Sequence, residues 1–130
     1  MRDLPQAEVT TLLQTLVSVP SCDPPGDEAE VARIVHEQML ALGINSEMDE
    51  FQPGRINVLG RVKGTGVKQA MVFSAHLDTV PVGTQSWDFP PFAGDVVSGQ
   101  LRGRGSSDMK SAVAAFIFAA AEIAARDEPL

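Results

Sequence analysis

Cysteine, aromatic residues and long apolar runs are all scarce in this chain of 130 residues. The single cysteine, Cys22, allows no disulfide within the chain, which fits a reducing cytoplasm. Aromatic residues make up 5% of the sequence, with one tryptophan and no tyrosine. The longest apolar run, Ala112–Ala121, is far shorter than the about 20 residues that a membrane-spanning helix needs. We therefore expect a cytoplasmic protein that does not bind membranes.

Positive charge is also scarce. The sequence has 10 lysine and arginine residues against 17 aspartate and glutamate residues, and its formal net charge is -7. Binding of nucleic acid requires a basic surface to meet the phosphates, and no basic run is present. The charge balance therefore argues against nucleic acid as a partner. Hydrophobic residues, at 44%, suffice for one domain with a core.

The pattern of apolar residues predicts helices at both ends of the chain. Helical periodicity indicates one helix over Gln6–Val19, a second that begins near Asp27, and a third over Met109–Arg126. Asp27 with Glu30 has the pattern of a capping box, and Gly43 is expected to end the second helix in a left-handed conformation. The third helix is apolar on nearly all sides, so we expect it to pack against a sheet.

Strands are predicted between these helices. Two mixed segments, Asn45–Phe51 and Ile56–Val62, have strand-like composition, and the nearly apolar Gln69–Ala75 resembles a strand covered on both faces. A short hairpin is predicted over Val96–Leu101. Helices that alternate with strands predict an α/β fold with a mixed, twisted sheet flanked by helices.

The first segment that suggests chemistry is Ser74–Pro81 (SAHLDTVP), which directly follows the apolar strand candidate. In α/β sheets, ligands bind beyond the carboxyl ends of strands. His76 and Asp78 are two residues apart, so both point to one side of an extended chain. Asp78 is then placed to accept a hydrogen bond from His76 and make it a better metal ligand. The alternative is a strand-end loop in which Asp78 caps a turn.

The second segment is Leu101–Lys110 (LRGRGSSDMK), at the start of the third helix. Its glycines allow a tight turn and close approach to a ligand, and Asp108 supplies a carboxylate suited to a divalent cation. Asp108 is equally suited to cap the helix, as are Ser106 and Ser107. Phosphate binding at this glycine-rich turn is a further alternative. A nucleophilic serine is disfavoured because the Gly-x-Ser-x-Gly pattern is absent.

Taken together with Trp87–Phe92 (WDFPPF), these two segments resemble the dinuclear zinc aminoacylase and deacylase family. That family includes acetylornithine deacetylase, succinyl-diaminopimelate desuccinylase and related peptidases. The order and spacing of the segments agree along essentially the whole chain, which corresponds to the first third of a family member. The resemblance implies that residues 1–130 are the N-terminal part of a zinc-exopeptidase-like catalytic domain, without its lid or dimerisation domain.

The resemblance also implies roles for three residues. His76 would bind one metal ion, Asp108 would bridge two divalent ions, zinc or alternatively cobalt, and Asp78 would be the catalytic-site carboxylate that orients His76. A cis peptide bond is implied between Asp108 and Met109. Bound water would then attack the amide carbonyl of a small N-acyl amino acid or peptide substrate.

Part of the implied site is missing from the sequence. The resemblance implies a general-base glutamate and an adjacent ligand glutamate after the third helix, but no Glu-Glu pair lies between Asp108 and Leu130. We therefore expect the isolated chain to be inactive, with partial or no metal occupancy, and to self-associate through exposed apolar surface. The alternatives are a non-catalytic binding or assembly module and, more remotely, a nucleotide-binding domain.

Overall fold

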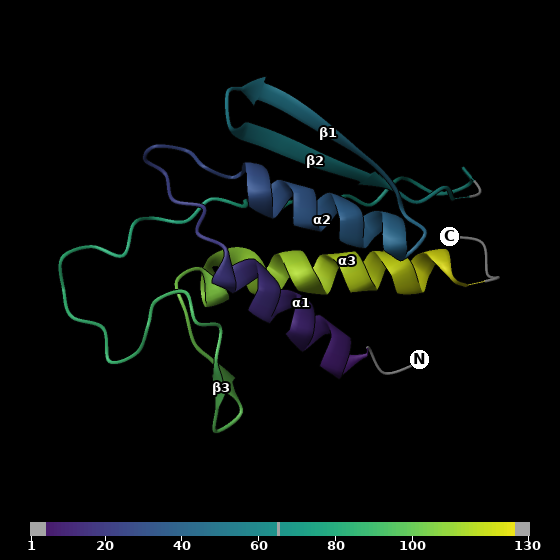
Figure 1. Ribbon diagram of the computed structural model, residues 1–130. Coiled ribbons are helices and arrows are strands. Elements are labelled where there is room, and N and C mark those ends of the chain that lie inside the picture. The colour runs from purple at the N-terminus through teal and green to yellow at the C-terminus, as the bar shows by residue number, and fades with distance from the viewer. Residues whose placement is uncertain (1–4, 65, 127–130) are drawn as a thin grey trace.

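The computed structural model describes residues 5–64 and 66–126. Three helices form a layer, and a β-hairpin packs on one of them (Figure 1). Helix α1 (Gln6–Ser18) buries Leu12, Leu16 and Val17 on one face, so the helix predicted from this apolar spacing is confirmed to within one residue at its end.

Helix α2 (Ala29–Ala41) begins later than the capping-box pattern predicts, and that prediction is wrong. The residue before the helix is Glu28, and no side chain caps the helix start. Glu30 does not reach back, because its carboxylate pairs with Arg33 one turn later, at 2.6 Å. The end of the helix is as predicted: Gly43 has φ +76°, and its N–H donates to the carbonyl of Leu40 at 3.0 Å.

The strands of the described chain form two separate antiparallel pairs. Strands β1 (Asn45–Gln52) and β2 (Arg55–Arg61) form a long hairpin that contacts α2. Strands β3 (Val96–Val97) and β4 (Gln100–Leu101) form the predicted short hairpin. The α/β composition is thus confirmed, whereas a single mixed sheet is not seen within the described residues.

The strand predicted over Gln69–Ala75 is wrong for the described structure, which assigns no strand there. Met71 is 77% exposed and Val72 82% exposed, so neither face of the segment is fully covered. Phe73 alone stacks on Phe116 of the last helix, with ring centroids 4.9 Å apart. A strand requires a hydrogen-bonded neighbour, and the apolar composition of a segment cannot supply one.

Helix α3 (Ser111–Ala124) contacts α1, α2 and the turn that precedes it, so the expected packing against a sheet is replaced by packing against helices. The core lies between these three helices and consists of apolar side chains: Leu12, Leu16, Val31, Val35, Val113, Ala114, Ile117 and Phe118. Within the described residues, every helix is too short or too polar to cross a membrane.

Candidate metal centre

The segment that carries His76 is fixed by the loop that follows α1. Ser21, which is fully buried, donates its hydroxyl to the carbonyl of Leu77 at 2.7 Å. The N–H of Thr79 donates to the carbonyl of Ser21 at 2.8 Å, and the N–H of Asp23 donates to the carbonyl of Thr79 at 2.9 Å. These contacts form a short parallel bridge, which holds the backbone on the C-terminal side of His76 against the helical layer.

Two glycines bring the second segment against the first. Gly105 has φ +81°, and a Cβ atom there would lie 2.5 Å from Cγ2 of Thr79. A Cβ atom on Gly103 would lie 2.3 Å from Cγ1 of Val17. Any larger residue would push the loop away from these neighbours. The glycines therefore allow the close approach that places Asp108 opposite His76.

Asp108 lies in a wide helical turn, η1 (Ser106–Lys110), directly before α3. Its φ and ψ, -126° and 96°, are not helical, and the Asp108–Met109 peptide bond is cis, as the family resemblance implies. Among the described residues, no side chain, that of Asp108 included, caps the start of this turn or of α3. The helix-cap alternative for Asp108 is therefore wrong, and its carboxylate, 88% exposed, is free to meet a ligand.

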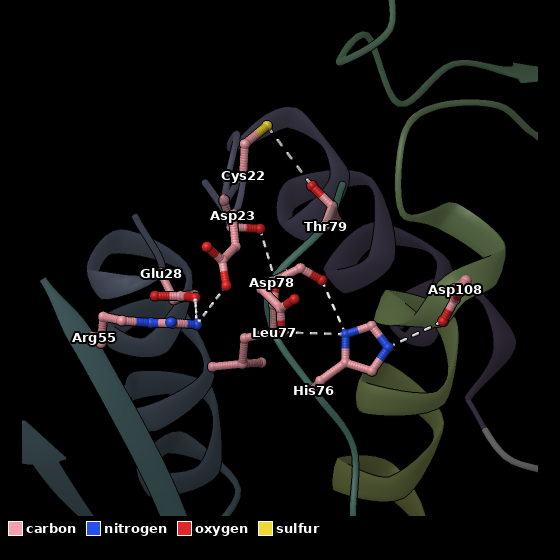
Figure 2. A network of polar contacts seen from close by, with 10 residues as sticks. Cys22, Asp23, Glu28, Arg55, His76, Leu77, Asp78, Thr79 and Asp108 are labelled. Carbon is pink, nitrogen blue, oxygen red and sulfur yellow. Dashed lines mark hydrogen bonds and ion pairs between the residues drawn. The ribbon is translucent and has the colours of Figure 1, made fainter. Parts of the chain in front are cut away.

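His76 lies between the two aspartates (Figure 2). Its Nε2 atom is 3.0 Å from Oδ1 of Asp108. Its Nδ1 atom is 2.9 Å from the backbone carbonyl of Asp78 and 3.4 Å from the Asp78 carboxylate. The structure thus brings all three predicted residues together, and the nearest acceptor for Nδ1 is the carbonyl of Asp78 rather than its side chain.

These contacts determine the protonation of the imidazole. A carbonyl only accepts hydrogen bonds, so Nδ1 carries a proton, and the ionised Asp108 carboxylate favours a second proton on Nε2. Desolvation lowers the pKa of His76, but the hydrogen bonds to the Asp78 carbonyl and the Asp108 carboxylate, with the attraction of both charges, outweigh it and raise the pKa above the ordinary value. When Nε2 is protonated, its proton occupies the place that a cation would take.

The donor set fits part of a metal centre. An imidazole nitrogen and a carboxylate oxygen are good ligands for zinc, and in a tetrahedral site with bonds of about 2.0–2.2 Å two such atoms lie roughly 3.3–3.6 Å apart. The 3.0 Å between Nε2 of His76 and Oδ1 of Asp108 is close to this separation. Within the described part of the chain, no group of three or more histidine, cysteine, aspartate or glutamate residues is arranged to hold a metal ion. These residues therefore form an incomplete ligand set.

Lys110 is a buried residue that the sequence analysis did not predict. It is fully buried, and its ammonium donates to the carbonyls of Leu16 and Val19 at 2.7 and 2.8 Å. These carbonyls lie at the C-terminal end of α1, where the helix dipole favours a cation. Lys110 thus ties the turn that carries Asp108 to α1. In the sequence, this role is indicated only by the position of a lysine directly before an apolar helix.

A second polar network lies beside the first (Figure 2). Arg55 of β2 pairs with Glu28 at 2.8 Å and with Asp23 at 3.0 Å. It joins the β1–β2 hairpin to the loop that holds the His76 segment. The sulfur of Cys22 lies 3.8 Å from the hydroxyl of Thr79, which agrees with a structural thiol. No sequence spacing indicates this network, because its partners come from distant segments.

The sequence is similar to those of proteins named as a deformylase and as desuccinylases. The chain is 34% identical over 121 residues to N-formyl-4-amino-5-aminomethyl-2-methylpyrimidine deformylase of Halalkalibacterium halodurans, covering 90% of this chain and 28% of the relative. It is 36% identical over 125 residues to succinyl-diaminopimelate desuccinylase of Variovorax paradoxus, covering 91% and 32%. It is 39% identical over 114 residues to the desuccinylase of Beijerinckia indica, covering 84% and 29%.

A family model then makes the assignment specific. Residues 72–129, which contain the His76 and Asp108 segments, match the model of Peptidase family M20/M25/M40. The resemblance predicted from the sequence is confirmed for the stretch that carries both segments. The chain spans 28% to 32% of the length of these three relatives, at their N-terminal part.

Proposed function

We propose that residues 1–130 form the N-terminal part of the catalytic domain of a metal-dependent hydrolase, which cleaves amide bonds in N-acyl amino acids or small peptides. The match of residues 72–129 to the family model and the desuccinylase and deformylase names of the relatives support hydrolysis of an acyl group. The observation that carries the proposal is the 3.0 Å contact between Nε2 of His76 and Oδ1 of Asp108. It joins two segments that are 32 residues apart in the sequence.

In this proposal His76 and Asp108 hold divalent cations, zinc or alternatively cobalt, and Asp108 is shared between two of them. When bound, such ions supply Lewis acidity and activate water for attack on an amide carbonyl. The Asp78 carbonyl keeps a proton on Nδ1 of His76, so that Nε2 is the nitrogen that binds. The Asp78 carboxylate, 3.4 Å away, adds negative charge that strengthens the imidazole as a ligand.

We further propose that other polypeptide completes the domain. Zinc sites in hydrolases use about three protein ligands per ion, whereas this pair offers two, and a general base is also required. The exposed side chains of Met71 and Val72 support a fold in which the Gln69–Ala75 segment joins a larger, mixed sheet. The same exposed side chains support self-association when no other polypeptide covers them.

A second candidate function has a specific observation in its favour. The described residues contain no set of three side chains arranged to hold a metal ion. A non-catalytic binding or assembly module that retains the half-site fold would have such an incomplete ligand set. This module would bind partner protein through the same apolar segment and would not depend on metal.

Zinc binding tests the proposed centre. We expect calorimetric titration of the 130-residue chain to show weak binding, which His76→Ala abolishes, and no hydrolysis of N-acetyl or N-succinyl amino acids. His36→Ala is the matched control, since it replaces the only other histidine, which contacts Ser46 rather than this site. Two tight zinc sites in the isolated chain, or binding that His76→Ala leaves intact, would contradict the proposal.

A further inference from the structure

The C-terminal end of α1 is buried and lacks a backbone donor. In a helix, the carbonyl of Leu16 would accept a hydrogen bond from the N–H of the residue four positions later. That residue is Pro20, and proline has no N–H. Leu16 is fully buried, so water does not replace the missing donor. A buried helix end without partners is costly, and the donor must therefore come from another segment.

Lys110 supplies that donor. Its ammonium donates to the carbonyl of Leu16 at 2.7 Å and to the carbonyl of Val19 at 2.8 Å. Lys110 is itself fully buried, and among the ion pairs of the described residues none involves it. Because Lys110 lies two residues after Asp108, its contacts with the end of α1 also fix the turn that carries the Asp108 carboxylate.

The loop directly after α1 holds the other side of the proposed centre. Ser21 is fully buried. Its hydroxyl donates to the carbonyl of Leu77 at 2.7 Å, and its own carbonyl accepts the N–H of Thr79 at 2.8 Å. Leu77 directly follows His76. Residues 19–21, here called the anchor segment, thus contact both of the segments that carry proposed metal ligands, at the point where α1 packs against η1 and α3 (Figure 1).

We propose that Lys110 and Ser21 are positioning residues, which together set the separation of the two proposed metal ligands from this shared anchor segment. Lys110 fixes Asp108 and Ser21 fixes His76, so loss of either contact changes the 3.0 Å between Nε2 and Oδ1. The side chains of His76 and Asp108 are 44% and 88% exposed, so packing around them does not determine this separation. The inference rests on the proposed hydrolase function, since it concerns the metal centre of that function.

The positive charge of Lys110 gives the expected effect a sign that can be tested. A cation near a metal centre repels a bound metal ion, so loss of the ammonium charge alone would strengthen metal binding. Loss of positioning weakens metal binding, because the two ligands are no longer held in the orientation that a shared ion requires. We expect the loss of positioning to prevail, because solvent screens charges at the exposed centre.

Zinc titration of the 130-residue chain measures this effect. We expect Lys110→Met and Ser21→Ala each to weaken zinc binding about tenfold or more, as is typical when groups that orient metal ligands are removed. Val35→Ala is the control, because it opens a cavity in the core on α2 and destabilises the chain while it leaves the contacts of the anchor segment in place. Under conditions where circular dichroism shows each variant to be folded, Val35→Ala should bind zinc as the unmodified chain does.

A second readout needs no metal. In the metal-free chain, the 3.0 Å contact places the ring of His76 beside the methylene group of Asp108. NMR should therefore show a nuclear Overhauser effect between their protons, with His36→Ala in the background so that His76 is the only histidine. We expect Lys110→Met and Ser21→Ala to weaken this effect.

Zinc affinity that is unchanged in Ser21→Ala, or unchanged or higher in Lys110→Met, would overturn the inference. An equal loss in Val35→Ala would also overturn it, because the effect would then be one of stability. If Lys110→Met does not fold, Ser21→Ala, which removes a single hydroxyl group, decides by the same criteria. If the unmodified chain binds no zinc, the proposed metal centre fails, whereas the Overhauser effect in the metal-free chain still decides whether the anchor segment positions the two side chains.

Discussion

Two contacts of His76 both favour protonation of its imidazole ring. The Asp78 carbonyl requires a proton on Nδ1, and the Asp108 carboxylate attracts one to Nε2. Their combined effect exceeds the desolvation that lowers the pKa of His76, so that pKa is raised. A metal ion that binds here must displace the Nε2 proton, and metal binding should release protons from the protein at acidic pH.

Removal of the Asp108 charge should therefore lower the pKa of His76. We expect Asp108→Asn to shift the titration of the His76 ring toward acid, measured by NMR on a chain in which His36→Ala leaves a single histidine signal. Asp49→Asn, in the distant β1 strand, serves as a control with the same loss of charge and should leave the titration in place. An unchanged titration in Asp108→Asn would show that the 3.0 Å contact has no electrostatic effect.

The raised pKa of His76 also sets the sign of a stability effect. The folded chain holds the His76 proton more tightly than the unfolded chain, so this contribution to stability is fully present below the unfolded pKa of about 6.5. It is lost as pH rises through the raised, folded-state pKa. The effect is small, because the His76 side chain is 44% exposed and solvent screens the contact.

At the scale of elements, Lys110 connects η1 to α1. Replacement by methionine keeps an apolar side chain of comparable length but leaves the carbonyls of Leu16 and Val19 without their donor. We expect Lys110→Met to lower the free energy of unfolding by about 1–3 kcal/mol, the usual cost of buried polar groups without partners. Urea denaturation measures the change, and Lys63→Met, at an exposed position, should stay within about 0.5 kcal/mol.

Burial lowers the pKa of Lys110 to about 8, because desolvation favours the neutral amine. Between about pH 8 and the ordinary lysine value of about 10.4, the unfolded chain then binds more protons than the folded chain. The contribution of Lys110 to the free energy of unfolding consequently rises with pH over this interval. The Lys110→Met variant should lack this rise, and an identical pH dependence in both proteins would contradict the assignment.

The sequence predicted those elements whose structure depends on local pattern. Periodic apolar residues located α1 and α3, and the local pattern over Val96–Leu101 located the short hairpin. Gln69–Ala75 was predicted wrongly because a strand depends on a neighbour that its own residues do not encode. Lys110 was missed for a related reason: its partners at Leu16 and Val19 lie 94 and 91 residues away in the sequence.

The candidate site, too, was predictable only in part from the local sequence. Spacing alone left His76, Asp78 and Asp108 open between metal-site residues and turn or cap residues. The family resemblance implied their roles, and the structure brings the three residues together. The acceptor for Nδ1 was not predictable, because a backbone carbonyl is present at every residue.

At the scale of the whole molecule, the ligand set is incomplete and an apolar segment is exposed. His76 and Asp108 form one wall of a site, and Met71 and Val72 expose apolar area to solvent. Both features support the same proposal, in which further polypeptide supplies ligands, a general base and neighbouring strands. They also explain why isolated residues 1–130 are expected to bind zinc weakly and to lack turnover.

The most direct measurement is hydrolysis by a chimera in which this chain replaces the aligned N-terminal part of the desuccinylase of Variovorax paradoxus. The proposal predicts metal-dependent hydrolysis of N-succinyl amino acids that His76→Ala and Asp108→Ala abolish and His36→Ala preserves. Circular dichroism establishes that each variant is folded, and zinc content establishes that the unmodified and His36→Ala chimeras are loaded. A folded, zinc-loaded chimera that remains inactive, or one whose activity survives His76→Ala, would contradict the assignment of His76 and Asp108 to the metal centre.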